Sequence, residues 1–223
     1  MGNAEKSIPV PQHSKPIPAP TLRRLPLYLQ MLKAQGYGPD KTVSCTVIAD
    51  AMGLQSIQVR KDLAHTGITG RPKTGYVAVE LIKAIEDFLG WNNSHDALLF
   101  GVGRLGMALL SYGGFSAQGL DIVAGVDVDA SKASWDVHGK KIIPLSKAQN
   151  LIRRLHIKIA IVTVPAASAQ AVCDLAVEAG VKAVWNFAPV QLRVPEGIIA
   201  QNENLAASLA VLSKKLNLSL KPN

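Results

Sequence analysis

The sequence predicts an α/β protein with a small helical domain, a doubly wound parallel sheet and one terminal helix, in that order. Three observations lead to this fold class: a glycine-rich turn between an apolar run and a helical pattern in mid-chain, several short helices before it, and an almost wholly apolar helix at the end. The chain has 223 residues, enough for two modest domains, and its 48% hydrophobic and 18% charged residues are typical of a folded chain.

The first twenty residues predict a flexible, proline-rich arm. Prolines stand at positions 9, 11, 16, 18 and 20 among small and polar residues. Such spacing disfavours a helix and favours an extended, solvated chain. We therefore expect residues 1–20 to form an arm outside the folded domains, although a contact with nucleic acid or a partner is an alternative.

Residues 21–90 predict a winged-helix domain that begins with one amphipathic helix. Thr21 is the expected capping residue and Gly36 the expected end of this helix. Leucines recur every three or four residues and predict its buried face. They are Leu22, Leu25, Leu29 and Leu32. Arg23 and Arg24 are expected on the outer face.

Two shorter helices follow with the spacing of a helix-turn-helix, joined at Gly53. Ser44 is the expected cap of the first helix, and Ser56 that of the second. The residues expected to point inward are Val47, Ile48 and Met52 in the first helix and Ile57, Val59 and Leu63 in the second. The residues expected to point outward from the second are Gln58, Arg60 and Lys61.

A basic hairpin and a closing helix complete this predicted domain. Residues 67–76 carry glycines near both ends and Arg71 and Lys73 at the tip, which predicts a wing able to lie along a minor groove. Residues 77–89 then predict a helix with four apolar residues along its buried face. They are Val79, Ile82, Ile85 and Leu89.

Positive charge is concentrated in this domain. Eight basic residues face three acidic ones between positions 21 and 75, and the whole chain carries a net charge of +8. We therefore expect double-stranded DNA as a partner, the alternative being a helical domain whose charges are simply solvated. The candidate DNA-binding residues are Arg23, Arg24, Ser56, Gln58, Arg60, Lys61, Arg71 and Lys73.

Residues 96–203 predict a Rossmann domain. The apolar run 97–100 has the length of a buried parallel strand, and residues 101–106 follow with the pattern Gly-x-Gly-x-x-Gly before a helical pattern. A second apolar run, 122–126, ends at Asp127. A strand, a glycine-rich turn, a helix and a strand ending in an acid are typical of a dinucleotide-binding unit.

Each glycine of this turn has a separate expected role. Gly101 permits the tight turn, Gly103 lets the backbone approach a pyrophosphate, and Gly106 lets the helix pack on the strand. The helix N-terminus offers free N–H groups to the phosphates. Asp127 stands 21 residues after Gly106 and can accept the ribose hydroxyls while repelling a 2′-phosphate. The sequence therefore predicts NAD, as NADH and NAD⁺, rather than NADP(H).

Further strands and helices alternate beyond Asp127, which predicts a parallel sheet covered on both faces. Strands are expected at 142–143, 160–164 and 183–185, and helices at 146–155 and 166–179. Two strand ends, 163–166 and 186–189, could face the nicotinamide half, or their prolines could be ordinary loop residues. The candidate cofactor-binding residues from this reasoning are Gly101, Val102, Gly103, Arg104, Leu105, Gly106, Asp127, Val128, Thr163, Val164, Pro165 and Asn186.

Residues 204–217 predict a helix that is apolar nearly all round. Leu205, Leu209, Leu212 and Leu216 form one stripe, and alanines and a valine occupy much of the rest. Such a helix must be buried. We expect it to be swapped into a second subunit of a homodimer; the alternative is docking on its own domain.

The remaining features exclude several classes. Cys45 and Cys173 lack metal-ligand spacing and are expected to be reduced and buried, so no metal site is predicted. No apolar run has transmembrane length, and the first twenty residues lack a signal-peptide core. We expect a cytoplasmic protein without a membrane partner.

The sequence resembles the Rex family of NADH-sensing bacterial transcriptional repressors from about Pro20 to Leu216. The supporting segments are Thr21–Tyr28 (TLRRLPLY), Gln58–Leu63 (QVRKDL), Gly75–Tyr76, Gly101–Gly106, Tyr112 with Gly114–Phe115, Asp127–Asp129, Val164–Ala166 and Asn186–Val190 (NFAPV). The resemblance implies a winged helix, a Rossmann domain and a C-terminal helix swapped within a homodimer. It also implies operator binding when NAD⁺ predominates and release when NADH does.

By position, the resemblance assigns further roles. Arg60 and Lys61 would lie on the recognition helix, and Tyr112 near the subunit junction where the nicotinamide is sensed, with Leu205 reaching the same pocket. Three places depart from the family pattern. They are residues 65–67, where the family has an aromatic stretch, Asn204, where an aspartate is common, and Leu205, where an aromatic residue is common.

Two other function classes compete with a non-enzymatic repressor. One is a small NAD-dependent oxidoreductase, against which no substrate domain follows the predicted sheet. Its candidate acid–base residues, His138, His156 and Lys158, have no convincing partner in the sequence. The other is a nucleotide- or coenzyme-A-binding regulatory module without DNA contacts, which the basic N-terminal segment disfavours.

Overall fold

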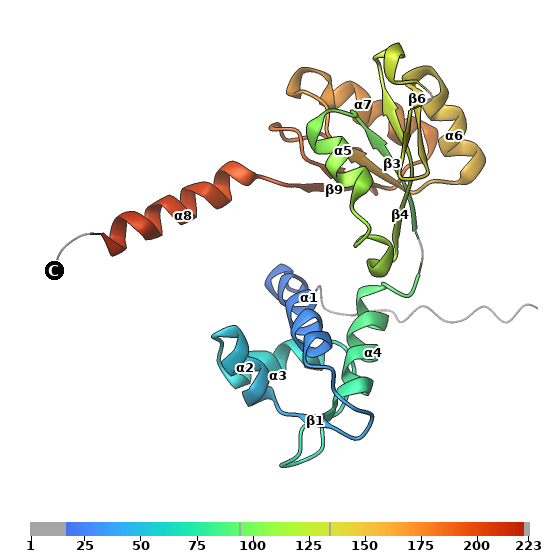
Figure 1. Ribbon diagram of the computed structural model, residues 1–223. Helices are drawn as coiled ribbons and strands as arrows, with labels where there is room; N and C mark the ends of the chain where they lie inside the picture. The colour runs from blue at the N-terminus through green and yellow to red at the C-terminus, as the bar shows by residue number, and fades with distance from the viewer. Residues whose placement is uncertain (1–16, 94, 134, 221–223) are drawn as a thin grey trace, which may run out of the picture. The chain divides into compact units, whose positions relative to one another are not determined.

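Figure 1 shows the computed structural model, which describes residues 17–93, 95–133 and 135–220. The chain divides into two compact units, Met1–Asn92 and Asn93–Asn223. Most of the predicted arm, residues 1–16, lies outside the described residues. Ala19 and Pro20 already belong to the first helix, so the predicted arm extends too far. Proline is tolerated in a first helical turn, where its missing N–H has no partner to lose.

The first unit is a helical domain with one short ladder. It contains α1 (Ala19–Ala34), β1 (Thr42–Val43), α2 (Cys45–Met52), α3 (Ser56–Ala64), β2 (Tyr76–Val77) and α4 (Ala78–Leu89). All four helices contribute to one core. Its fully buried members include Leu25, Leu29, Ile48, Val59, Leu63, Leu81 and Ile85.

The predicted caps of this unit are partly wrong. Ser44 caps α2 as expected, since its Oγ accepts the N–H of Val47, and Gly53 ends that helix. Thr21 is not a cap, because α1 begins two residues earlier and Thr21 is buried inside it. Ser56 is not a cap either: Gln55 holds the extended cap position, and Ser56 is already helical.

Four residues predicted to point inward are exposed instead: Leu22, Val47, Ile57 and Val79. Each stands at the edge of its helix's buried stripe. Each helix buries only one face against the shared core, so the apolar side chains beside that face remain exposed.

The basic segment after α3 differs from the predicted hairpin. Its tip is a tight turn closed by a single bridge between Arg71 and Gly75, with Lys73 at a backbone φ of 66°. The ladder at its base instead pairs β2 with β1, antiparallel, so that Val43 lies opposite Tyr76. The sequence did not predict β1, because two residues carry no periodicity.

The second unit is built around a seven-stranded sheet in the order β5-β6-β4-β3-β7-β8-β9. The strands are β3 (His95–Phe100), β4 (Leu120–Asp127), β5 (Asp136–Val137), β6 (Lys140–Pro144), β7 (Ile159–Val162), β8 (Ala183–Asn186) and β9 (Ile199–Asn202). All neighbours pair in parallel except β5 and β6. Without β5, this is the strand order 3-2-1-4-5-6 of dinucleotide-binding sheets.

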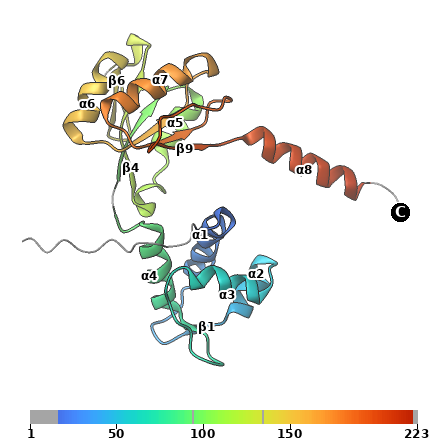
Figure 2. The same cartoon turned by 180° about the vertical axis from the view of Figure 1, so that it is seen from behind.

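Helices cover both faces of the sheet, as Figures 1 and 2 show from opposite sides. Residues of α5 (Arg104–Ser111) pack in one cluster with Ala97, Leu99 and Ile161. Residues of α6 (Ala148–Leu155) and α7 (Ala166–Ala179) pack in another with Leu98 and Phe100. The predicted doubly wound sheet is confirmed.

Two edge strands, β5 and β9, were not predicted. β5 has two residues, and β9 ends in two exposed polar residues, Gln201 and Asn202, so neither has the apolar run of a central strand. The last helix, α8 (Leu205–Ser219), follows β9 directly. None of the described helices combines the length and the apolar character needed to cross a membrane.

Candidate functional site

A cavity of about 790 Å³ opens at the carboxyl ends of β3, β4 and β7. Its walls come from the glycine-rich turn, the end of β4 and the first turns of α7. The order of the sheet reverses between β3 and β7, and ligands of doubly wound sheets bind at that point. The cavity therefore lies where a nucleotide is expected.

The glycine-rich turn has the shape that a pyrophosphate requires. Gly101 has a φ of 95°, and a Cβ there would overlap Thr163 and Val164. A Cβ at Gly106 would overlap the carbonyl oxygen of Gly101, so only glycine lets α5 approach β3 this closely. A Cβ at Gly103 would meet nothing within 4 Å. Gly103 thus leaves open space in front of the first turn of α5, whose leading N–H groups lack helical acceptors.

Asp127 stands at the end of β4 and is held by three hydrogen bonds. Its Oδ2 accepts the N–H of Val102 at 2.8 Å and the ammonium of Lys132 at 2.9 Å. Its Oδ1 accepts the N–H of Asp129 at 2.9 Å. Burial alone would raise the pKa of this carboxyl, but these three bonds together hold the pKa below its ordinary value. Asp127 is therefore a fixed, ionised carboxylate.

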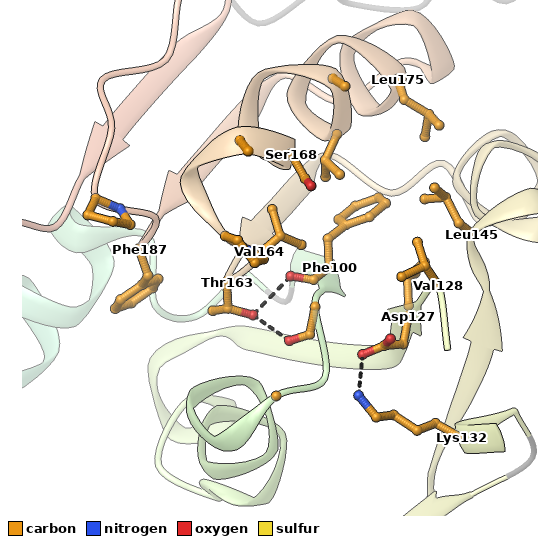
Figure 3. A pocket seen from close by; sticks show the side chains of 18 residues that line it. Phe100, Asp127, Val128, Lys132, Leu145, Thr163, Val164, Ser168, Leu175 and Phe187 are labelled. Carbon is orange, nitrogen blue, oxygen red and sulfur yellow. Dashed lines mark hydrogen bonds and ion pairs between the residues drawn. The ribbon is translucent and has the colours of Figure 1, made fainter. Parts of the chain in front are cut away.

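The opposite side of the cavity is apolar. Figure 3 shows Asp127 and Lys132 on one side and Phe187 on the other. Thr163 Oγ1 donates to the carbonyl oxygens of Phe100 and Gly101 at 2.9 and 2.7 Å, which ties the end of β7 to the glycine-rich turn. A ligand spanning the cavity would meet a charged end and an apolar end.

The structure brings together about half of the residues predicted for the cofactor. Those that line the cavity are Gly101, Gly103, Asp127, Val128, Thr163, Val164 and Pro165. Val102 and Gly106 are buried beside it and act through Asp127 and through helix packing. Arg104 and Leu105 are exposed in the first turn of α5. The side chain of Leu205 lies outside the described part of the chain.

Asn186 does not line the cavity. It is fully buried, and its amide is hydrogen-bonded to its own loop and to β9. Its Nδ2 donates to the carbonyl of Val190 and to Asn202 Oδ1, at 2.7 and 2.8 Å, and its Oδ1 accepts the N–H of Ala188 at 3.0 Å. Asn186 therefore shapes the 187–190 loop and fastens β8 to β9.

Tyr112 is also absent from the cavity wall, but a row of packed aromatic side chains connects Tyr112 to the cavity. Phe187 lies against Trp185 with ring centroids 4.9 Å apart, and Trp185 against Phe115 at 5.6 Å. Phe115 contacts Tyr112 edge-on at 4.9 Å. Tyr112 itself is 54% exposed. It stands at the outer end of a packed route that begins in the cavity.

Several cavity residues were missed from the sequence. They are Phe100, Val126, Lys132, Leu145, Ala167, Ser168, Ala171, Val172 and Leu175. Phe187 and Pro189 also line the cavity, and they belong to the 186–189 strand end that was expected as one side of the nicotinamide position. Most of the missed residues belong to apolar runs whose inward orientation depends on the packing of α7 against the sheet. Lys132 had a usable signal, because it is a cation five residues after the predicted ribose carboxylate.

In the first unit, the buried carboxylate of Asp62 ties α3 to α1. It accepts two bonds from Arg24, both at 2.7 Å, one from Tyr28 at 2.8 Å and one from Thr21 at 2.9 Å. Gln58 adds a fifth bond at 3.1 Å. Burial opposes ionisation, but the bonds from Arg24 and its neighbours lower the pKa of Asp62 to about 2.

This arrangement corrects two candidate DNA contacts. Arg24 and Gln58 were predicted to point outward, but both are engaged with Asp62. The sequence shows Asp62 only as one charge among basic neighbours, so its burial could not be seen there. The engaged side chains fix how α3 lies on α1.

The other candidate DNA contacts remain available. Arg23, Arg60, Lys61, Arg71 and Lys73 are exposed, and Ser56 is half-buried at the start of α3. Arg60, Arg71 and Lys73 line a hollow of about 570 Å³ between α3 and the 68–76 segment. Cationic side chains from α3 and a neighbouring turn thus line one concave surface.

Comparison with known proteins agrees with both units. A family model described as "CoA binding domain" matches residues 92–190, and one described as "Putative DNA-binding protein N-terminus" matches residues 16–64. The redox-sensing transcriptional repressor Rex of Treponema denticola is 42% identical over 199 residues, which cover 89% of this chain and 95% of the relative. Rex of Bacteroides fragilis is 43% identical over 204 residues, covering 92% and 93%.

Two solved structures are similar to this chain over nearly its whole length. The crystal structure of RSP in complex with β-NAD⁺ and operator DNA has a TM-score of 0.85 at 29% identity and covers 92% of this chain and 95% of that chain. RSP in complex with β-NADH has a TM-score of 0.82 at 29% identity, covering 92% and 97%.

An N-terminal DNA-binding helical domain joined to a Rossmann-like sheet defines a class of transcription regulators that respond to a nucleotide. Within that class, the chain belongs to the Rex family of redox-sensing transcriptional repressors. The family is one of repressors and not of enzymes.

Proposed function

We propose that this protein is a redox-sensing repressor that binds operator DNA as a homodimer and releases it when NADH occupies the cavity at the switch point of the sheet. One observation carries the proposal: the same chain holds Asp127, a fixed carboxylate placed to bind a ribose, and an exposed basic helix-turn-helix. The redox-sensing repressors of Treponema denticola and Bacteroides fragilis align with this chain over nearly their full length, which supports the proposal.

The nucleotide would lie with its adenosine ribose at Asp127, its pyrophosphate before Gly103 and its nicotinamide toward Phe187. The open space at Gly103 and the N-terminus of α5 support the middle position. The apolar end formed by Val164, Pro165 and Phe187 supports the last. The fit of the chain to NAD(H) is good at each of the three positions.

DNA would be bound by α3 in the major groove, with the 68–76 segment as a wing beside it. The exposed cations Arg60, Arg71 and Lys73 around one hollow support this arrangement. Arg24 and Gln58 act in this proposal through Asp62, by holding α3 in place, and not as base contacts.

The homodimer would form through α8. Leu209, Leu212 and Leu216 lie on one face of this helix and are 54–63% exposed in the single chain. An apolar stripe of this kind is stable only when covered. Asn204, which replaces the aspartate common in the family, caps α8 by accepting the N–H of Ala207 at 2.9 Å. Asparagine at position 204 therefore still provides an N-terminal cap for α8.

The switch follows from different affinities of two dimer arrangements. A ligand that binds both equally shifts neither. We propose that an apolar junction near Tyr112 and the start of α8 prefers the uncharged reduced nicotinamide to the charged oxidised ring. The aromatic chain from Phe187 to Tyr112 supports a packed route to that junction. Filling it would change the spacing of the two recognition helices, and so the match to both half-sites.

The test is fluorescence anisotropy of a labelled AT-rich inverted-repeat duplex with the full chain, with NADH or NAD⁺ added in turn. We expect binding that NADH abolishes and NAD⁺ leaves intact. Binding that ignores both nucleotides would contradict a redox switch. If this duplex is not bound, selection from a random duplex pool decides between a changed operator and the absence of DNA binding.

The competing oxidoreductase is tested by hydride transfer. Incubation with NADH and candidate carbonyl substrates should give no loss of absorbance at about 340 nm beyond the spontaneous rate. Turnover of any substrate would overturn the assignment as a repressor alone.

A further inference from the structure

The carboxylate that would receive the adenosine ribose already holds a cation. Lys132 Nζ lies 2.9 Å from Asp127 Oδ2 and also donates to the carbonyl oxygen of Val102 at 3.1 Å. Only 23% of the Lys132 side chain and 9% of the Asp127 side chain are exposed. Both line the cavity, and Figure 3 shows the ammonium directed at the carboxylate. Lys132 is thus part of the site and not a surface charge near it.

A count of hydrogen-bonding positions shows what this pair can offer a ribose. A carboxylate has about four acceptor positions and an ammonium three donors. Val102, Lys132 and Asp129 use three of the positions on Asp127 among the described residues, two on Oδ2 and one on Oδ1. Lys132 uses two of its donors within the same part of the chain. One acceptor and one donor remain, which match two vicinal hydroxyls better than Asp127 alone does.

We propose that Lys132 is a second ribose-binding residue and that the Asp127–Lys132 pair, not Asp127 alone, sets the choice between NAD(H) and NADP(H). The inference rests on the proposed binding of NAD(H) in this cavity. While the pair is intact, Asp127 neutralises most of the charge of Lys132. A 2′-phosphate would then lie against a carboxylate, with no unneutralised cation to attract it. With Asp127 neutral, the ammonium would be unpaired at the edge of the ribose position and would attract a 2′-phosphate.

Nucleotide affinities of variants can separate a role of Lys132 from repulsion by Asp127 alone. If repulsion acts alone, Asp127→Asn removes the discrimination and leaves NADH and NADPH bound about equally. If Lys132 is a latent phosphate ligand, Asp127→Asn reverses the preference, and the reversal requires Lys132. A charge-assisted bond to phosphate corresponds to at least about a tenfold change in affinity.

The experiment is a set of titrations on the full-length chain. NADH and NADPH are followed by their fluorescence, and adenosine 5′-monophosphate and adenosine 2′,5′-bisphosphate by calorimetry. The variants are Asp127→Asn, Lys132→Gln and the double variant. Lys182→Gln is the matched control, because Lys182 is an exposed lysine just before β8, at the amino ends of the parallel strands and not at the carboxyl ends where the cavity opens.

We expect the wild-type chain to prefer NADH, and Lys132→Gln to bind it several-fold more weakly. Asp127→Asn should gain about tenfold in affinity for NADPH and for the bisphosphate, and the double variant should lose that gain. Lys182→Gln should behave as wild type. A double variant that binds NADPH as well as Asp127→Asn does would overturn the inference, as would unchanged NADH affinity in Lys132→Gln. A wild-type chain that binds neither NADH nor adenosine 5′-monophosphate would instead refute the proposed nucleotide site.

Discussion

Asp62 shows how one buried residue can position a DNA-binding helix without touching DNA. Its carboxylate is 1% exposed and joins Arg24 and Tyr28 of α1 to α3. Asp62→Asn keeps the shape but turns an amide N–H toward guanidinium donors. We expect a loss of about 2–3 kcal/mol in the free energy of unfolding, measured with urea. The control is Asp87→Asn, since the Lys83–Asp87 pair is exposed and its loss should change little.

The same carboxylate predicts a pH dependence with a definite sign. The pKa of Asp62 is lowered from 3.8 to about 2 in the folded chain, so ionisation stabilises the fold above about pH 4. That contribution, about 2 kcal/mol, is lost as the pH falls toward 2. The stability difference between wild type and Asp62→Asn should therefore shrink as the pH is lowered from 5 to 2. A difference that stays constant over this range would contradict the assignment.

Two glycines of the same turn separate folding from binding. Gly106→Ala would place a Cβ against the Gly101 carbonyl and should destabilise the chain by about 1–3 kcal/mol, because α5 must move from β3. Gly103→Ala has open space and a φ of −84°, so its stability should stay within about 0.5 kcal/mol. Gly103→Ala should nevertheless lower the affinity for NADH by about tenfold or more, because the added Cβ occupies the space where the pyrophosphate would approach the backbone. Thermal unfolding and NADH titration of both variants test this; normal NADH affinity in Gly103→Ala would refute the pyrophosphate position.

At the scale of elements, the sequence predicted those whose periodicity is set by burial. The strands of the sheet centre and α7 at 166–179 appear where the apolar pattern placed them. The edge strands β5 and β9 have no such pattern and were missed. The site followed the same division: Asp127 and the glycines could be found by spacing, whereas the burial of Asp62 and the pairing of Lys132 arise only when distant segments pack.

The element with the least support in its own chain is α8. If its leucine stripe forms the dimer, Leu212→Glu places a charge in the interface and should convert the dimer to a monomer at micromolar concentration. Lys214→Glu changes a residue on another face of α8 and should leave the dimer intact. Sedimentation velocity measures both. A Leu212→Glu chain that remains dimeric would show that another surface joins the subunits.

At the scale of the whole molecule, the proposed switch is a coupling between nucleotide and operator, and binding linkage is reciprocal. If NADH weakens operator binding by a given factor, operator DNA must weaken NADH binding by the same factor, typically about 5–150-fold. We expect that factor in NADH titrations of the wild-type chain with and without operator duplex. In Leu212→Glu, NADH affinity should no longer depend on DNA, because a monomer has no spacing between two recognition helices to change. If the monomer keeps the full coupling, the signal must pass between the two units of a single chain, and the rotation of subunits is not the mechanism.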